Sequence, residues 1–379
     1  MAPIKVGVIG YGFAAKNFHL PFVNALPDYE VVAVLQRAEA PADAGSVAKG
    51  THCTVDFPGV KHHRTADAFF ANSDIEFVVV ASHADTHVLF AEQALKAGKH
   101  VIIDKPFARS TEEADSVIAL AKEKGLILTC FQNRRYDGDF LTVQEILKKG
   151  TLGDVNEAEI HYDFDQAPWL KFMKGKEYTA GDGHTFGLGT HSLDQAYMLF
   201  GRPASVTAFF RVQRGIESEV EDSFTIILQY DGKQKGLLVT VKTCVVSPMA
   251  QQLKFWIRGT RGSYIKHQQR SSCPQEEDIA RGAQPLDPDF AAEPDALRGT
   301  LTTYKEFDKS IQAFDEASQR YVGKYPTVRG HWMQLYQNVA DAINGKARLA
   351  IEAAQVRDVL RMIELGRESH EKSRTIAWN

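Results

Sequence analysis

The sequence predicts two domains, an N-terminal α/β domain with a parallel sheet and a C-terminal α+β domain with a large, mainly antiparallel sheet. At 379 residues the chain exceeds the size at which a single hydrophobic core usually stops growing. Up to residue 131, short apolar runs alternate with longer segments of helical period, the pattern of parallel strands joined by crossover helices. Beyond it, runs that alternate apolar and polar side chains indicate strands covered on one face. We therefore expect domains at residues 1–131 and 132–379.

Five apolar runs are expected to form the parallel strands of the first domain. They are continuously apolar, as in strands that are covered on both faces. These runs are residues 4–9, 31–35, 77–81, 100–103 and 127–131. Ser110 with Glu113 forms a capping-box pattern that predicts the start of a helix, and Gly98 and Gly125 stand where helices should end. Local signals and the global pattern therefore agree.

The second domain is expected to combine a broad sheet with a few amphipathic helices. Strands are predicted at residues 158–164, 205–211, 223–230, 236–246 and 253–257, and helices at residues 140–149, 330–343 and 353–365. Residues 271–298, rich in Pro, Asp, Glu and Gln, are typical of a long irregular loop. The sheet would leave one apolar face uncovered in a monomer, so we expect a homodimer or homotetramer.

Composition excludes several classes of partner. A net charge of −4 gives no broad positive field, so we expect no nucleic-acid partner, and no apolar run is long enough to span a bilayer. The four cysteines are far apart and form no C-x-x-C pair, which favours reduced thiols over a disulfide framework or a zinc knuckle. The N-terminus lacks the pattern of a secretory signal, so the cytoplasm is the expected compartment.

A glycine-rich motif follows the first apolar run. Gly10, Gly12 and Ala15 form a G-x-G-x-x-A match where a strand must turn into a helix. Gly10 permits the tight turn, Gly12 lets the backbone approach a pyrophosphate, and Ala15 keeps helix and strand close. Phe13 and Ala14 begin the helix, whose N-terminal amides would face the anion. The motif predicts a Rossmann domain that binds a nicotinamide dinucleotide.

The end of the second run indicates which coenzyme is bound. An acidic residue here would hydrogen-bond the ribose hydroxyls of NAD, but the sequence has Gln36 and Arg37. A guanidinium can instead pair with a 2′-phosphate. NADP is therefore favoured and NAD is the alternative; a solvated surface arginine is the other interpretation of Arg37.

Four segments together resemble the glucose-fructose oxidoreductase / inositol dehydrogenase / rhizopine catabolism (Gfo/Idh/MocA) family. Residues 97–106 resemble its A-G-K-H-V-x-x-E-K-P stretch, and residues 82–87 its T-P-x-x-x-H loop with His83 in place of proline. Residues 132–135 resemble its Q-N-R-R segment, and residues 188–195 its L-G-x-H-x-x-D-Q segment. The resemblance covers essentially the whole chain, in order and at similar spacing.

This resemblance implies a hydride-transfer enzyme that acts on a sugar, a polyol or a related hydroxyl compound. By similarity, Lys105 would lie beside the nicotinamide and hydrogen-bond the reacting oxygen, and His191 would exchange the hydroxyl proton, for which imidazole is suited. Further cofactor contacts are expected from Ser82, His83, His87, Asp104, Asn133 and Arg134. Further substrate contacts are expected from Arg135, Trp169, Asp182, His184, Thr190 and Asp194. For Asp194, orientation of the site and simple solvation of a helix remain alternatives, and Trp169 could equally anchor a loop.

The sequence also departs from the family pattern. Gly187 stands where the family has an aspartate that completes a Lys/Asp/His set, and Asp104 replaces the usual glutamate before the lysine. Catalysis could be slowed, rerouted through Asp182 or His184, or lost. The second hypothesis is therefore a dinucleotide-binding regulator, for which the family offers precedent in a galactose-gene co-repressor. We favour the enzyme.

A metal ion is not expected. His184, His191 and Asp194 do not have the spacing of a metal site, and hydride transfer needs no metal. His62 and His63 are interpreted as a pair at the edge of a strand of the first domain.

Overall fold

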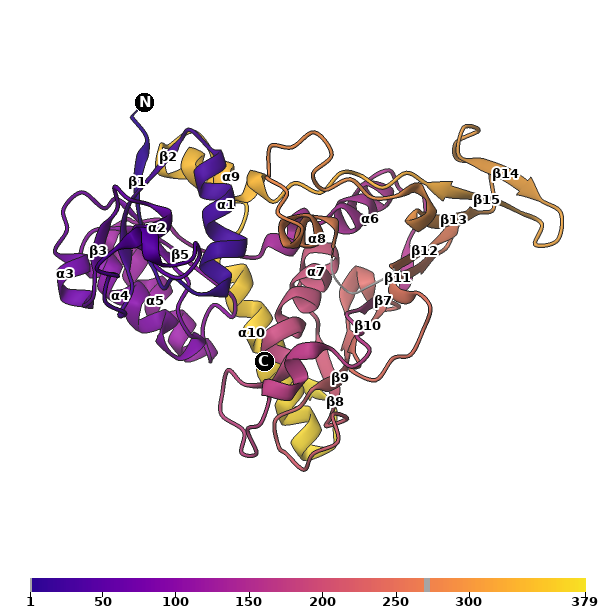
Figure 1. Ribbon diagram of the computed structural model, residues 1–379. Coiled ribbons are helices and arrows are strands. Elements are labelled where there is room, and N and C mark those ends of the chain that lie inside the picture. Colours follow the sequence, from indigo (N-terminus) through magenta and orange to yellow (C-terminus); the bar gives the residue numbers. More distant parts are fainter. Residues whose placement is uncertain (1, 269–272) are drawn as a thin grey trace. The chain divides into compact units, whose positions relative to one another are not determined.

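The computed structural model describes residues 2–268 and 273–379, and the chain forms two compact units. The first unit contains Met1–Asn133, Asp278–Phe290 and Trp332–Arg357, and the second contains Arg134–Glu277, Ala291–His331 and Asp358–Asn379. A division into independently folding domains at residue 131 stays a prediction, because packing units need not fold independently. Figure 1 shows the elements of both units.

The first unit is built on a six-stranded parallel sheet in the order β3-β2-β1-β4-β5-β6. Its strands are β1 (Ile4–Ile9), β2 (Tyr29–Leu35), β3 (Lys61–His63), β4 (Phe77–Val80), β5 (His100–Ile103) and β6 (Leu128–Cys130). The strand order reverses between β1 and β4, and ligands of such sheets bind at this switch point, outside the carboxyl ends of the strands. The predicted Rossmann architecture is confirmed.

Helices cover both faces of this sheet. They are the π-helix η1 (Ala15–His19), α1 (Leu20–Ala25), α2 (Cys53–Asp56), α3 (Ala66–Phe70), α4 (His87–Lys96), α5 (Thr111–Lys124) and α9 (Met333–Ile343). As predicted, Ser110 caps α5 by accepting a hydrogen bond from the Glu113 amide at 3.2 Å, and Gly125 ends it with φ +64°. The Glu113 carboxylate accepts from the Arg109 amide at 2.9 Å, so the capping box closes one residue earlier than its usual form.

Helix α9 joins the first unit although β6 ends at Cys130 and α9 begins only at Met333. The Tyr29 hydroxyl donates to the backbone oxygen of Tyr336 at 2.7 Å, and the His19 Nδ1 lies 2.5 Å from the Tyr336 hydroxyl. Phe22 and Trp332 pack with ring centroids 5.7 Å apart. The Phe22–Trp332 contact lies on the apolar side of α1, and the two polar contacts hold Tyr336 of α9 against η1 and β2.

The second unit is built on a large mixed sheet that is mostly antiparallel. In its described part the strand order is β14-β15-β13-β12-β11-β7-β10-β9-β8-β16, and β7 and β10 form its parallel pair. The strands are β7 (Val155–His161), β8 (Ser205–Arg211), β9 (Ser223–Gln229), β10 (Leu238–Thr243), β11 (Gln252–Gly259), β12 (Gly262–Gln268), β13 (Gly299–Thr303), β14 (Gln312–Asp315), β15 (Arg320–Tyr325) and β16 (Ile376–Ala377). The predicted α+β architecture is confirmed.

One face of this sheet is covered by helices and the other is open. Helices α6 (Gly138–Lys148), α7 (Thr190–Phe200) and α10 (Ala353–Lys372) are the long helices here, although α10 begins in the first unit. In β8, Val206, Ala208 and Phe210 are buried on the covered face, whereas Phe209 on the opposite face is 54% exposed. A side chain at Gly366 of α10 would come within 3.4 Å of the Ala208 Cβ, which shows how closely this helix packs.

The irregular loop predicted at residues 271–298 is partly helical, and its residues 271 and 272 lie outside the described part. Helix α8 (Pro274–Ala280) and a 3-10 turn at Asp295–Leu297 interrupt it. A proline at the first helical position and the acids Glu276 and Glu277 in the first turn are signals for a helix start, and the polar composition obscured them.

No helix in the described parts of the chain is both long and apolar enough to cross a membrane.

Candidate active site

The glycine-rich turn between β1 and η1 leaves space for a ligand. Gly10 has φ +92°, and a Cβ there would lie 2.6 Å from the Ala81 carbonyl oxygen, so a side chain is excluded. Apart from Gly12 and its two chain neighbours, no heavy atom of the described residues lies within 4 Å of the Cβ position of Gly12. Ala15 is fully buried, and Phe13 is 71% exposed. This open backbone at the start of a helix fits a pyrophosphate.

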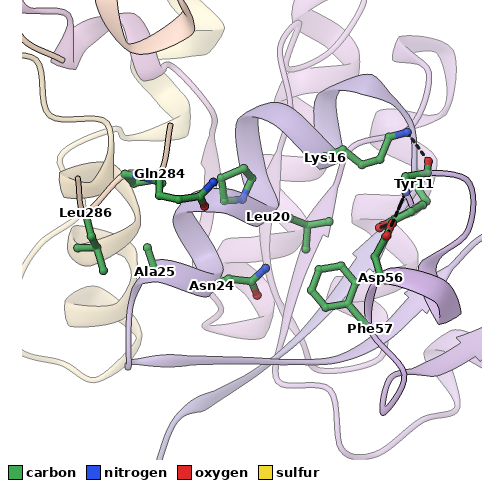
Figure 2. Close-up of a pocket in the computed structure, with 12 residues that line it drawn as sticks. Tyr11, Lys16, Leu20, Asn24, Ala25, Asp56, Phe57, Gln284 and Leu286 are labelled. Atoms are coloured by element: carbon green, nitrogen blue, oxygen red, sulfur yellow. Dashed lines mark hydrogen bonds between the residues drawn. The ribbon is translucent and has the colours of Figure 1, made fainter. Parts of the chain in front are cut away.

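A polar network that the sequence did not predict ties this turn to the loop before β3 (Figure 2). The Tyr11 hydroxyl donates to the Asp56 carboxylate, which also accepts from the Gly50 amide at 2.9 and 3.0 Å. The Lys16 ammonium donates to the Gly50 carbonyl at 2.7 Å. Burial, helped by the hydrogen bond to Asp56, raises the pKa of Tyr11, so the phenol keeps its proton. A pocket of about 540 Å³ borders this network, lined also by α1 and by Phe57.

The two residues after β2 have different roles. The Gln36 side chain is used within the protein, because its Oε1 accepts from the Cys53 amide at 2.9 Å and its Nε2 donates to the Thr51 carbonyl at 3.3 Å. Arg37 is exposed, and its backbone oxygen accepts from the Arg64 Nε at 3.2 Å. The Arg37 guanidinium is thus displayed on a braced loop.

His87 connects the loops that follow β4 and β5. Its Nδ1 lies 2.8 Å from the Pro106 carbonyl oxygen and its Nε2 3.1 Å from that of Ser82, and its ring is 1% exposed. Both ring nitrogens therefore face backbone, so His87 positions the two loops. The Ser82 hydroxyl accepts from Thr86 at 2.8 Å, and His83 is exposed.

Asp104 and Lys105 follow β5. The Lys105 amide donates to the Asp104 carboxylate at 2.8 Å, and the His19 Nε2 lies 3.6 Å from the same oxygen. Burial acts to raise the pKa of Asp104, but His19, Lys105 and His87 outweigh it, so the pKa is lowered and the carboxylate is charged. Asn133, 5% exposed, ends the first stretch of this unit.

In the second unit, His191 is the second residue of α7. This helix directly follows the π-helix Thr185–Gly189, which contains Gly187. Such π-helical insertions occur frequently at functional sites. A Cβ at Gly187 would have the His184 Cδ2 at 3.8 Å, an ordinary contact, so a side chain fits there. His191 is 4% exposed, and its ring lies nearly parallel to that of Tyr162, with centroids 6.4 Å apart.

A buried lysine that the sequence did not predict lies against the same tyrosine. An irregularity in β11 between Leu253 and Phe255 turns Lys254 toward the covered face of the sheet. The Lys254 ammonium lies 3.1 Å from the centre of the Tyr162 ring, and both side chains are 1% exposed. Burial lowers the pKa of Lys254 to about 8. Bulges often re-aim side chains near active sites.

Asp194, for which the sequence left two alternatives, is buried in an ion pair. Its carboxylate accepts from the Arg135 Nε at 2.7 Å and from the Arg135 Nη2 at 2.6 Å. The Asp194 side chain is 2% exposed and the Arg135 side chain is 5% exposed. This bidentate pair fixes the face of α7 that carries His191.

Two other residues expected in the site are also buried. Thr190 is 1% exposed. The Arg134 side chain pairs with Asp137 at 3.3 Å and with Glu276 at 2.5 Å.

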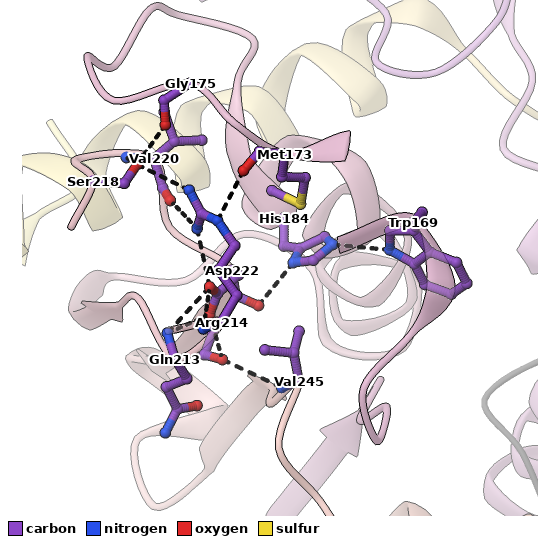
Figure 3. Close-up of polar contacts among 11 residues, drawn as sticks. Trp169, Met173, Gly175, His184, Gln213, Arg214, Ser218, Val220, Asp222 and Val245 are labelled. Carbon is purple, nitrogen blue, oxygen red and sulfur yellow. Dashed lines mark hydrogen bonds and ion pairs between the residues drawn. The ribbon is translucent and has the colours of Figure 1, made fainter. Parts of the chain in front are cut away.

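His184 and Asp182, considered as substitutes for the missing aspartate, are placed differently, and Figure 3 shows His184 with its partners. The His184 Nδ1 donates to the Asp222 carbonyl at 2.8 Å, and the Trp169 indole donates to the His184 Nε2 at 3.2 Å. Burial lowers the pKa of His184, which keeps the ring neutral. Asp182 is exposed and accepts from the Thr179 amide at 3.1 Å. Trp169 thus anchors its loop to His184.

The chain belongs to the GFO/IDH/MocA oxidoreductase family. The family described as oxidoreductase with an NAD-binding Rossmann fold matches residues 4–132, and the GFO/IDH/MocA C-terminal domain matches residues 140–265. These matches confirm the resemblance found in the sequence.

Several relatives are similar along almost their whole length. An uncharacterized oxidoreductase of Schizosaccharomyces pombe is 37% identical over 380 residues, covering 99% of this chain and 100% of the relative. The scyllo-inositol 2-dehydrogenase (NADP(+)) IolW of Bacillus subtilis is 30% identical, covering 98% of this chain and 95% of the relative. The crystal structure of an oxidoreductase from Bacillus cereus superposes with a TM-score of 0.83 at 25% identity, covering 99% of each chain.

Proposed function

We propose that this oxidoreductase is an NAD(P)-dependent dehydrogenase or reductase that transfers a hydride between the nicotinamide and a sugar, a polyol or a related hydroxyl or carbonyl compound. One observation carries the proposal: the open glycine turn after β1 and Lys105 after β5 belong to the carboxyl edge of one parallel sheet. Ligands of such sheets bind along this edge at the switch point.

The residues of the chain would divide the chemistry between them. The turn at Gly10 and Gly12 would hold the dinucleotide, which would supply the hydride-transfer chemistry. Lys105 would hydrogen-bond the reacting oxygen and stabilise the negative charge that develops on it. His191 would take the hydroxyl proton during oxidation and give it back during reduction.

Two observations support the substrate class and the coenzyme. A relative that is 30% identical over nearly the whole chain is named as an NADP(+)-linked dehydrogenase of scyllo-inositol, a polyol. The exposed guanidinium of Arg37 stands where an acid would favour NAD. We therefore propose NADP as the preferred coenzyme, with NAD as the alternative.

The alternative function, a dinucleotide-binding regulator, has one specific observation in its favour. Gly187 removes a carboxylate, and the neighbouring imidazole of His184 already has a partner for each ring nitrogen. A regulator of this kind would bind the coenzyme without turning over any sugar or polyol.

We also propose that the open face of the second sheet pairs with another copy of the chain. Apolar side chains on this face, such as Trp256 and Ile265, are only half-buried. Burial of such a face against a second subunit removes it from water, which favours a homodimer or homotetramer.

Replacing Lys105 tests the proposed catalytic role. The Lys105→Met variant should lose roughly 10²- to 10³-fold in kcat, because it removes a hydrogen-bond donor to the reacting oxygen. Steady-state rates with an inositol and sugar panel and both coenzymes measure this. The exposed Lys96 is the matched control, and Lys96→Met should keep the wild-type rate. Equal rates from the two variants would refute the role of Lys105.

Restoring the carboxylate tests whether the usual mechanism operates. Gly187→Asp should raise kcat/KM by roughly 10-fold or more, because a carboxylate would support the positive charge that His191 gains when it takes the hydroxyl proton. Gly187→Asn, which has the same shape without the charge, is the control and should give no gain. If the two variants behave alike, the missing charge does not limit catalysis. Coenzyme binding with no turnover by any of these proteins would favour the regulator.

Coenzyme selectivity depends on Arg37 in this proposal. Arg37→Ala should weaken NADP binding by roughly 10- to 100-fold, through loss of a charge-assisted hydrogen bond to the 2′-phosphate. NAD binding, which lacks that phosphate, should stay the same. Fluorescence titration with both reduced coenzymes gives the two dissociation constants. An equal loss of affinity for both coenzymes would contradict the role of Arg37 in binding the 2′-phosphate.

The oligomeric state tests the use of the open sheet face. The wild type should have the mass of a dimer or tetramer by light scattering. The Ile265→Glu variant should have a lower mass, because association would bury an unpaired carboxylate in the interface between subunits. Ser318→Glu, on an exposed turn, should leave the mass unchanged. A monomeric wild type would overturn this proposal.

A further inference from the structure

Two histidines and a cysteine that are separated in sequence meet beside the end of β2. His52 and Cys53 stand at the start of α2, and His62 lies in β3. One potential ligand atom from each side chain lies within 4.8 Å of the other two. Cys53 is fully buried, His52 is 4% exposed and His62 is half-buried. No step of the proposed hydride transfer uses these groups.

The surroundings of His62 orient it as a metal ligand. Its Nε2 lies 2.8 Å from the Gln36 carbonyl oxygen, and donation of the Nε2 proton to that oxygen leaves the Nδ1 lone pair available. Metal-binding histidines usually donate their other ring N–H to such an outer acceptor, which fixes the tautomer and the direction of the ring. Here a backbone carbonyl supplies that acceptor.

The His52 ring caps α2, because its Nδ1 accepts from the Thr54 amide at 3.3 Å. Its Nδ1 lies 2.8 Å from the Thr54 hydroxyl, and its Nε2 lies 3.4 Å from the Ala38 carbonyl oxygen. The Nε2 contact is long for a hydrogen bond. Coordination through Nε2 would move the ring proton to Nδ1, which can then donate to the Thr54 hydroxyl in place of accepting from the Thr54 amide. The His52 and His62 rings are nearly perpendicular, with centroids 4.5 Å apart, so two ring edges can converge on one point.

The donor set matches a borderline-soft ion. Two imidazoles and a thiolate are typical ligands of tetrahedral Zn²⁺, with bonds of roughly 2.0–2.3 Å. Such bonds place donor atoms roughly 3.5 Å apart, so the three side chains would have to draw together by about 1 Å. Two of the three ligands stand on α2, a helix of only four residues, so the shift would fall mainly on this short helix.

We propose that His52, Cys53 and His62 form a site for one divalent ion of the zinc class, with water as the fourth ligand. As the metal–sulfur bond forms, the Cys53 thiol releases its proton to solvent. The site is separate from the chemistry of hydride transfer, and it would hold whether or not the proposed function does.

The site would also brace the loop that displays Arg37. The Cys53 amide donates to the Gln36 side chain at 2.9 Å, and His62 contacts the Gln36 backbone. A bound ion would therefore link α2, β3 and the residue next to Arg37 through a single centre. Its direct consequence is a more stable first unit, because the folded state alone assembles the three ligands.

Cobalt titration tests the site directly. The full-length protein, treated with a chelator and kept reduced, should bind one equivalent of Co²⁺ with a thiolate-to-cobalt charge-transfer band and the visible bands of a tetrahedral ion. Zn²⁺ should then displace the cobalt. Added Zn²⁺ should also raise the thermal unfolding midpoint of the wild type.

Three variants separate this site from adventitious binding. Cys53→Ser should abolish the charge-transfer band, and His62→Gln should weaken Co²⁺ binding by roughly 100-fold or more, since even outer-shell changes weaken metal sites 10- to 100-fold. Cys244→Ser, at a half-exposed thiol in the second unit, should bind like the wild type. Circular dichroism of the metal-free variants establishes whether they fold. If Cys53→Ser does not fold, the Co²⁺ affinity of the His62→Gln variant tests the site. A wild type without the charge-transfer band, or a folded His62→Gln variant with wild-type affinity, would overturn the proposal.

Discussion

The close approach of β1 and β4 at Gly10 is the constraint on which the proposed coenzyme-binding turn depends. A Cβ at Gly10 would lie 2.6 Å from the Ala81 carbonyl oxygen, and φ is +92°, so glycine is required for both steric and conformational reasons. This turn exposes the backbone at Gly12 and starts the following helix. The network from Tyr11 through Asp56 to Gly50 then holds the loop before β3 against the turn.

The second unit positions His191 through buried polar contacts. The Arg135–Asp194 pair is almost wholly excluded from water, and removing one partner of such a pair leaves an uncompensated charge, at a loss of about 3–5 kcal/mol. His184 is held by Asp222 and Trp169, which leaves Gly187 as an open position in a helical turn that is otherwise fixed. The scaffold around His191 is therefore ordered although a glycine stands at position 187.

Sequence patterns predicted the elements whose signals are local. The strand at Ile4–Ile9, the Ser110 cap and the Gly125 end of α5 all follow from neighbouring residues. The partnership of Tyr11 with Asp56 spans 45 residues, and the meeting of Cys53 with His62 depends on how α2 sits beside β3, so no local pattern indicates either. The burial of Asp194 likewise depends on Arg135, 59 residues earlier. Contacts of this kind arise from tertiary packing, which propensity and periodicity do not encode.

Calorimetric titration of the purified protein with NADP⁺ and NADPH tests the central claim most directly, because every catalytic assignment depends on a dinucleotide held at the turn after β1. The account predicts saturable binding of one coenzyme per chain, and its loss in a Gly12→Val variant whose side chain fills the open space over the turn. Absence of any heat of binding with either pyridine coenzyme at millimolar concentration, or unchanged binding by a folded Gly12→Val variant, would contradict it.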